Sequence, residues 1–212
     1  MVDFKDKSIW ITGGGTGLGA AMALELAGLG ARVAISGRRM EMLREVSDVH
    51  PERIVPLVCD VTDEAAVEAT VKAIVADFGG LDVAIANAGF SVSGRLETLS
   101  AQDWRRQLEV NVIGATSTVV AALPHLKKSG GRIGLVGSVA GTITTPGAGA
   151  YSASKYAVRA IGQTLSMELH GTGVSCTTLQ PGFVKSDIGR TDNNGVFQSS
   201  SRDRRPSKLL WE

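Results

Sequence analysis

The sequence predicts an α/β protein built on a doubly wound parallel sheet, in a single domain. Strand-like and helix-like patterns alternate along most of its 212 residues. The strand-like segments, such as residues 81–86, are nearly all apolar, as is typical of strands covered on both faces. The first strand-like segment, residues 9–12, runs directly into a loop with five glycines and then into an Ala/Leu-rich segment. Repeated alternation of this kind implies right-handed crossovers, and therefore parallel strands.

Six strands are expected, with five helices between them. The expected strands are residues 9–12, 32–36, 53–58, 81–86, 132–136 and 174–179. The expected helices are residues 20–29, 40–49, 62–78, 100–126 and 151–170. A polar cap at Thr62 begins the third helix, Gly79 ends it, and a capping-box pattern at Ser100 begins the fourth. A ligand of such a sheet is expected at the carboxyl ends of the strands, beside the first strand.

Composition excludes several classes of protein. The formal charge of +1 gives no indication of nucleic acid as a partner. The chain begins without a secretory signal, and no segment reaches the ~20 apolar residues of a membrane span, so we expect a cytoplasmic protein without membrane contact. The three histidines are scattered, and the two cysteines lie in apolar strand-like runs, which predicts reduced thiols and no metal site.

The glycine-rich loop from Gly13 to Gly19 carries the first indication of function. Glycines allow the backbone to approach a pyrophosphate closely, and the start of the following helix offers free N–H groups and a positive dipole end. The alternative is a strand-to-helix turn that binds nothing.

The next informative position is the end of the second strand, at Ser36-Gly37-Arg38-Arg39. A fold of this type that selects NAD usually has Asp or Glu there, to hold the ribose 2′-hydroxyl. Two guanidinium groups suit a 2′-phosphate instead, which favours NADP(H), with NAD(H) as the second choice. Alternatively, Arg38 and Arg39 are only solvated side chains at the start of a helix.

Three further positions are informative only in combination. Asp60 either meets an adenine edge or forms a turn. The small residues of Asn87-Ala88-Gly89 either let a cofactor lie against the backbone or form a plain turn. Asn111 lies in a helical run, where a buried amide needs partners and binds either a water or a backbone carbonyl.

Ser138 follows the fifth strand, and Tyr151 and Lys155 lie one turn apart on one face of the last helix. A phenol with a reference pKa of about 10 is a poor acid–base group at neutral pH, but a nearby ammonium can lower that pKa by roughly 1–3 units. The phenol then exchanges protons with an alcohol or a carbonyl. Taken alone, a Tyr-x-x-x-Lys pair is more often a surface pair.

Together these motifs resemble the short-chain dehydrogenase/reductase family, over Lys5 to about Gly189. The matching motifs are Thr12-Gly13-x-x-x-Gly17-x-Gly19, Asp60, Asn87-Ala88-Gly89, Asn111-Val112-x-Gly114, Ser138, Tyr151-Ser152-Ala153-Ser154-Lys155 and Pro181-Gly182-Phe183-Val184. The resemblance implies a Rossmann-like fold and an NAD(P)-dependent oxidoreductase. Two departures are Ala86, where the family often has Asn, and a length below the family's usual span of about 250 residues.

The resemblance also implies roles for individual residues. Tyr151 is the expected general acid or base, Ser138 the hydrogen-bond donor to the substrate oxygen, Lys155 the group that tunes the phenol and holds the nicotinamide ribose, and Asn111 the holder of a relay water. The expected cofactor-binding residues are Gly13, Gly15, Thr16, Gly17, Leu18, Gly19, Arg38, Arg39, Asp60, Val61, Asn87, Ala88, Gly89, Lys155, Pro181, Gly182 and Val184.

We therefore expect an enzyme that interconverts a small-molecule carbonyl and a secondary alcohol with NADP(H). A dinucleotide-binding sensor without turnover is the alternative from another class. A sugar-nucleotide epimerase is less consistent, because Thr16 stands where its loop needs Gly.

The end of the chain is expected to differ from the rest. Residues 1–190 form the expected oxidoreductase domain, and residues 191–212 a polar tail of loop or disorder, in which Leu209-Leu210-Trp211 is a candidate apolar plug. The last strand, residues 174–179, would have an unpaired outer edge with no charge and no Pro, which favours a homo-oligomer.

Overall fold

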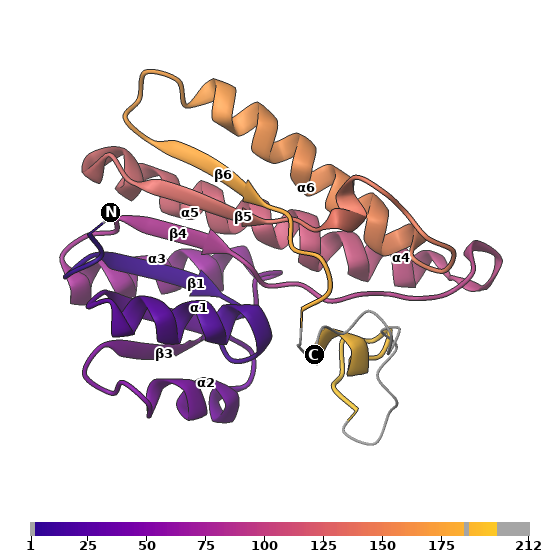
Figure 1. Ribbon diagram of the computed structural model, residues 1–212, viewed down its shortest axis with the longest axis horizontal. Helices are drawn as coiled ribbons and strands as arrows, with labels where there is room; N and C mark the ends of the chain where they lie inside the picture. Colours follow the sequence, from indigo (N-terminus) through magenta and orange to yellow (C-terminus); the bar gives the residue numbers. More distant parts are fainter. Residues whose placement is uncertain (1–2, 185–186, 199–212) are drawn as a thin grey trace.

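The computed structural model describes residues 3–184 and 187–198 (Figure 1). Its centre is one parallel sheet of six strands in the order β3-β2-β1-β4-β5-β6, which confirms the predicted fold. The strands are β1 (Ser8–Thr12), β2 (Arg32–Gly37), β3 (Ile54–Val58), β4 (Val83–Ala86), β5 (Arg132–Val136) and β6 (Ser175–Leu179).

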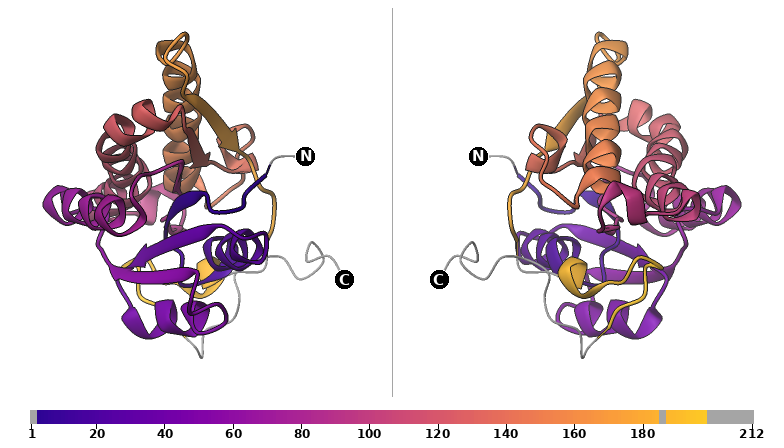
Figure 2. Two further views of the ribbon diagram at one scale, coloured as in Figure 1. Left: turned by 90° about the vertical axis from the view of Figure 1, so that its left-hand side faces the viewer. Right: turned by 90° about the vertical axis from the view of Figure 1, so that its right-hand side faces the viewer.

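The helices divide between the two faces of the sheet. Their bounds are α1 (Gly17–Gly28), α2 (Met40–Ser47), α3 (Glu64–Phe78), α4 (Ala101–Leu108), α5 (Gly114–Ser129) and α6 (Gly149–Glu168). Helices α3, α5 and α6 share one apolar cluster with the strands, and α1 and α2 share a second cluster on the opposite face. On that second face, no helix of the described chain covers β5 and β6 (Figures 1 and 2).

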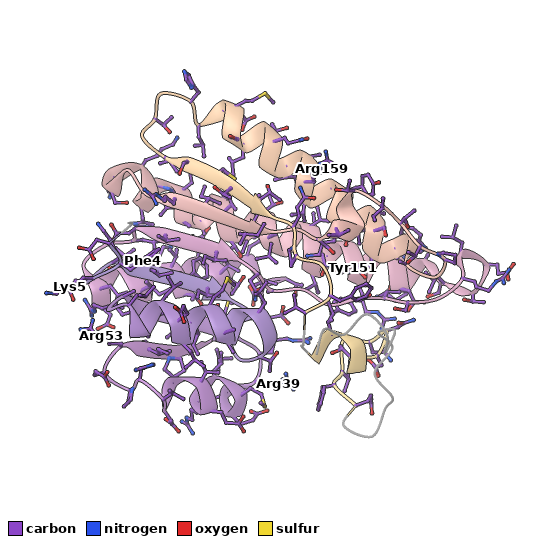
Figure 3. The ribbon with its side chains drawn as sticks, viewed as in Figure 1. Phe4, Lys5, Arg39, Arg53, Tyr151 and Arg159 are labelled. Atoms are coloured by element: carbon purple, nitrogen blue, oxygen red, sulfur yellow. The ribbon has the colours of Figure 1, made fainter. Side chains whose placement is uncertain are left out.

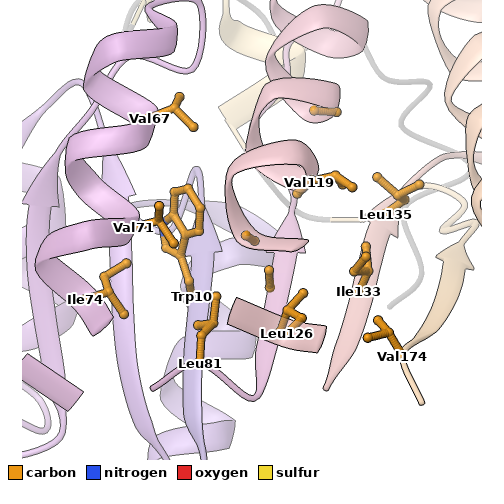
Figure 4. Close-up of a cluster of buried hydrophobic side chains, with 14 of the residues drawn as sticks. Trp10, Val67, Val71, Ile74, Leu81, Val119, Leu126, Ile133, Leu135 and Val174 are labelled. Atoms are coloured by element: carbon orange, nitrogen blue, oxygen red, sulfur yellow. The ribbon is translucent and has the colours of Figure 1, made fainter. Parts of the chain in front are cut away.

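The larger cluster surrounds Trp10, which is completely buried in the middle of β1 (Figure 4). Val67 and Val71 of α3 lie on one side of it, and Val119 and Leu126 of α5 belong to the same cluster. The buried indole N–H has a hydrogen-bond partner, because Nε1 donates to the Ser36 hydroxyl at 3.0 Å. This bond joins β1 to β2 from inside the core.

Two predicted caps are present. Ser100 and Asp103 form a reciprocal capping box at the start of α4, with the Asp103 N–H donating to the Ser100 hydroxyl at 3.2 Å and the Ser100 N–H donating to the Asp103 carboxylate at 2.9 Å. Gly79 ends α3 with a φ of +81°. The capping residue of α3 is Asp63 rather than Thr62, since its carboxylate accepts from the Ala66 N–H at 3.1 Å.

The long helix expected at residues 100–126 is interrupted. Helix α4 ends at Leu108, five residues from Glu109 to Ile113 form a π-helix, and α5 then continues to Ser129. The interruption surrounds Asn111, the residue with poor helix propensity. A π-turn widens the helix locally and is frequently found at functional sites.

The described residues after β6 lie at the carboxyl ends of the strands. Asp187–Arg190 form a short 3-10 helix, and an antiparallel bridge then joins Thr191 to Phe197. The rest of the predicted tail, with Leu209-Leu210-Trp211, lies outside the described residues. Among the residues that are described, no helix has the length and apolarity that a membrane crossing requires.

Candidate active site

A cavity of about 1510 Å³ opens at the carboxyl ends of the strands, where the fold predicts a ligand. This volume exceeds the roughly 300–1000 Å³ of most small-ligand pockets, so it is large enough for a cofactor and a substrate together. Figure 3 shows Arg39 and Tyr151 at this end of the molecule, with Phe4 and Lys5 at the other end.

The glycine-rich loop forms one wall of the cavity. Gly13 has a φ of +67°, and a Cβ there would lie 2.8 Å from the Ala88 Cα. A Cβ on Gly19 would lie 2.3 Å from the Gly13 carbonyl oxygen. Glycine is therefore required at both positions by the close approach of the backbone, and Gly19 serves this packing without lining the cavity.

The loop is fixed to the segment after β4 by a set of hydrogen bonds. The Thr12 hydroxyl accepts from the backbone N–H groups of Asn87 and Ala88, each at 3.1 Å. In return, the Asn87 amide Nδ2 donates to the carbonyl oxygens of Thr12 at 2.9 Å and Gly13 at 3.1 Å. No pattern in the sequence indicates these partners of Asn87, whose side chain holds the glycine-rich loop in place.

The start of α1 faces the same cavity. Its capping residue, Thr16, makes no side-chain capping bond, and Gly15, Gly17 and Leu18 line the cavity beside it. A helix start with free N–H groups in a glycine cradle fits a pyrophosphate. Arg38 and Arg39 line the cavity at the end of β2, so the residues present fit a nicotinamide dinucleotide.

Asp60 also lines the cavity, and one oxygen of its carboxylate already accepts hydrogen bonds within the chain. Oδ1 accepts from the Thr62 N–H at 3.0 Å and from the Thr62 hydroxyl at 2.9 Å. Asp60 is therefore a turn-forming residue, and the same turn places it against the cavity.

Ser138, Tyr151 and Lys155 come together at the other end of the cavity. Burial raises the pKa of the Tyr151 phenol above its ordinary value, and a hydrogen bond with the Ser138 hydroxyl partly offsets that increase. The Lys155 Nζ lies 5.7 Å from the centre of the Tyr151 ring and donates to the Val136 carbonyl oxygen at 2.8 Å.

Lys155 is 5 % exposed, and burial lowers the pKa of its ammonium to about 8. An amine with this pKa changes its charge near neutral pH, which an exposed lysine does not. The three groups can therefore hold and move a proton at the Tyr151 oxygen.

Asn111 is not among the residues that line the cavity. Its amide Oδ1 accepts from the Phe90 N–H at 3.0 Å, and Nδ2 donates to the Phe90 carbonyl oxygen at 3.0 Å and to the Ser154 hydroxyl at 3.1 Å. The side chain therefore links the segment after β4 to α6. The two predicted alternatives for this amide are a water and a backbone carbonyl, and the structure shows a bond to the Phe90 backbone carbonyl.

A second buried amide also binds the segment after β4. Gln107 lies one helical turn before Asn111 and is completely buried. Its Nε2 donates to the Phe90 carbonyl oxygen at 2.9 Å, and its Oε1 accepts from the Val92 N–H at 2.6 Å. The spacing of two amides four residues apart was visible in the sequence, but their shared partner in another loop was not.

The structure thus brings together nearly all of the predicted site residues. Gly13, Gly15, Thr16, Gly17, Leu18, Arg38, Arg39, Asp60, Val61, Asn87, Ala88, Gly89, Ser138, Tyr151, Lys155, Pro181, Gly182 and Val184 line the cavity, whereas Gly19 and Asn111 do not. Sequence reasoning missed Arg106 and residues 194–197, which line it too.

Comparison with known proteins agrees with this geometry. The family model for short chain dehydrogenases matches residues 7–196, and the chain therefore belongs to this family of NAD(P)-dependent oxidoreductases. An uncharacterized oxidoreductase of Staphylococcus aureus strain MW2 is 37% identical, over 89% of this chain and 82% of its own length. An uncharacterized oxidoreductase of Myxococcus xanthus is 36% identical, over 91% of this chain and 78% of its own.

Solved structures show the same fold. A short chain dehydrogenase/reductase from Burkholderia phymatum in complex with NAD superposes with a TM-score of 0.88 at 30% identity, over 98% of this chain and 76% of its own. An NAD+-bound xylitol dehydrogenase gives a TM-score of 0.82 at 32% identity, over 86% of this chain and 72% of its own.

The lowered pKa of Lys155 predicts a pH dependence of stability. The folded chain loses this proton near pH 8, and the unfolded chain at the ordinary value of 10.5, so the free energy of unfolding rises with pH between these values and the gain is lost below pH 8. Relative to Lys155→Met, we expect the parent to gain about 2 kcal/mol between about pH 7 and pH 10 in urea titrations. The exposed Lys128→Met is the control, and a constant difference between parent and Lys155→Met would contradict the assignment.

Proposed function

We propose that the chain is an NADP(H)-dependent oxidoreductase that interconverts a carbonyl compound and a secondary alcohol. The observation that carries this proposal is the convergence of Ser138, Tyr151 and Lys155 on the cavity that begins at the glycine-rich loop. A dinucleotide sensor without turnover would need the loop but has no use for a buried phenol, hydroxyl and amine at the far end.

The roles follow from the position and chemistry of each side chain. When bound, the nicotinamide supplies or accepts the hydride. Ser138 donates a hydrogen bond to the substrate oxygen and holds it near the phenol. Tyr151 gives the proton to that oxygen during reduction and removes it during oxidation.

Lys155 makes this proton transfer accessible. Burial alone disfavours the phenolate, so a positive charge close to the ring is needed to stabilise it. The ammonium lies against the same ring and is held in place by the Val136 carbonyl. Its position between β5 and Tyr151 also suits a contact with the nicotinamide ribose.

The choice of NADP(H) rests on the end of β2. Arg38 and Arg39 provide two positive charges and no carboxylate at the position that faces the adenosine ribose, and both line the cavity. Two of the similar solved structures hold NAD. The proposed preference for NADP(H) is therefore argued from Arg38 and Arg39 of this chain, and the comparison with those structures does not support it.

Replacement of the phenol tests the mechanism. Tyr151→Phe should lower kcat by at least about 100-fold while NADPH affinity stays within about twofold, because only the proton-carrying oxygen is lost. The matched control is Tyr156→Phe, the other tyrosine of α6. It lies outside the cavity, and among the residues that the structure describes its hydroxyl donates only to the Thr142 carbonyl oxygen, so this variant should keep its activity. Retention of most of the rate by Tyr151→Phe would remove the mechanism.

A second substitution tests the cofactor. One charge-assisted contact is worth roughly 1.5–3 kcal/mol, so the parent should bind NADPH about 10- to 150-fold more tightly than NADH, and Arg38→Asp should reverse the order. Arg44→Asp, an exposed arginine on α2, makes the same charge change away from the cavity and should leave both affinities unaltered. Equal affinities in the parent would overturn the NADP assignment.

We also propose that copies of the chain associate through β6. Among the strands that the structure describes, β6 is the last in the sheet order, and Ser175, Thr177 and Leu179 are exposed on the face that the described helices leave uncovered. Thr177→Lys should shift light-scattering mass towards the monomer, whereas Val49→Lys, at an exposed residue after α2, should not. A parent that is monomeric at all concentrations would contradict this proposal.

A further inference from the structure

A small hairpin lies at the end of the cavity that is lined by Arg38 and Arg39. We call Thr191–Phe197 the cleft hairpin; its ends are joined by the bridge between Thr191 and Phe197. The Asp192 carboxylate accepts from the N–H groups of Asn194 at 2.8 Å and Val196 at 2.9 Å, which holds the turn together. At the turn, Gly195 has a φ of +77°, a conformation that favours glycine.

On one side, the cleft hairpin is fixed to the segment after β4 and to α4. The Asn193 amide makes two bonds with the backbone of Ser93: its Oδ1 accepts from the N–H at 3.0 Å, and its Nδ2 donates to the carbonyl oxygen at 3.1 Å. The Arg106 guanidinium donates to the Asn194 amide oxygen. Asn193 itself does not line the cavity.

On the other side, the cleft hairpin contacts the two arginines at the end of β2. The Arg38 Nη2 donates to the Gly195 carbonyl oxygen at 3.0 Å. A Cβ built on Gly195 would lie 3.6 Å from the same Nη2 and 4.0 Å from Nη1. The terminal edge of the guanidinium, with both Nη atoms, therefore faces the cleft hairpin. The Arg39 guanidinium lies 5.8 Å from the centre of the Phe197 ring.

This edge is one that a phosphate uses for a bidentate bond. A 2′-phosphate that binds Arg38 in this way must displace the Gly195 carbonyl, whereas a ribose with a free 2′-hydroxyl need not. We infer that the cleft hairpin is a specificity-determining element, in which Gly195 competes with the 2′-phosphate for Arg38 and so lowers the preference for NADP(H) over NAD(H). This inference rests on the proposed binding of NADP(H) at Arg38.

Asn193 is the positioning residue of this element. Its two bonds to Ser93 hold the cleft hairpin at the wall opposite Arg38, so their loss should weaken the competitor without altering any residue that lines the cavity. The ligand with the 2′-phosphate should then bind more tightly, and the ligand without it should bind as before.

The test uses adenosine 2′,5′-bisphosphate and adenosine 5′-monophosphate as probes, with calorimetry as the readout. In Asn193→Ala of the full chain, we expect the Kd of the bisphosphate to fall about 3- to 10-fold, the effect of one or two neutral hydrogen bonds, with the Kd of the monophosphate unchanged. Gln102→Ala, an exposed amide on α4, should change neither Kd. In an Arg38→Ala background, Asn193→Ala should not lower the Kd of the bisphosphate, because the guanidinium for which Gly195 competes is absent.

Hydrogen exchange supplies a readout independent of affinity. The bisphosphate should accelerate exchange of the Val196 amide, which the Asp192 carboxylate protects, and the monophosphate should not. Equal slowing of exchange by both probes would show that the cleft hairpin closes over either ligand and would overturn the inference.

The same measurements separate the two proposals. If Arg38→Ala does not weaken the bisphosphate, the NADP assignment fails, and the inference fails with it. If Arg38→Ala weakens it but Asn193→Ala changes both probes equally or neither, the NADP assignment stands and the competition is wrong.

Discussion

The site depends on one clasp between β1 and β4. At this point of the sheet the chain order reverses and the strand ends open a crevice. The Thr12 hydroxyl and the Asn87 side-chain amide join the two strand ends through five hydrogen bonds to backbone groups. This approach leaves no room for a Cβ at Gly13, and it sets where the glycine-rich loop ends and where α1 begins. The cavity floor is thus built by the same contacts that join the two halves of the sheet.

Much of this was predictable from the sequence, for physical reasons. Strands buried on both faces read as apolar runs, and Gly79 or the Ser100 capping box acts through neighbours only a few residues away. The contacts that were not predictable are polar and distant. Asn193 and Ser93 form hydrogen bonds although they are 100 residues apart in the sequence, and Arg38 and Gly195 are 157 residues apart. No periodic pattern in the sequence indicates either pair. The motif at Asn111 is recognisable in the sequence. The three hydrogen bonds of its amide are not, because they depend on where the fold places Phe90 and Ser154.

The proton chemistry proposed for the site follows from shared burial. Burial disfavours phenolate at Tyr151 and ammonium at Lys155, so each group alone would stay neutral more readily than in water. A phenolate beside an ammonium carries no net charge, and each stabilises the other. The proton transfer proposed for Tyr151 therefore depends on the position of the Lys155 amine. The Val136 carbonyl keeps the amine in range of the ring, so the coupling is built into the junction of β5 and α6.

The π-helix at Glu109–Ile113 separates the phase of the core-facing helix from the sequence at the site. Each residue of an α-helix turns the chain by roughly 100°, and a π-turn takes up one extra residue by widening instead of by turning further. Helix α5 therefore keeps the orientation relative to α4 that an uninterrupted helix one residue shorter would give it. Val119, Ala122 and Leu126 remain in the core and Val120 remains exposed in either case. A family member that lacked this one residue could keep the apolar stripe of its fifth helix, so the brace at Asn111 and the core pattern can change independently.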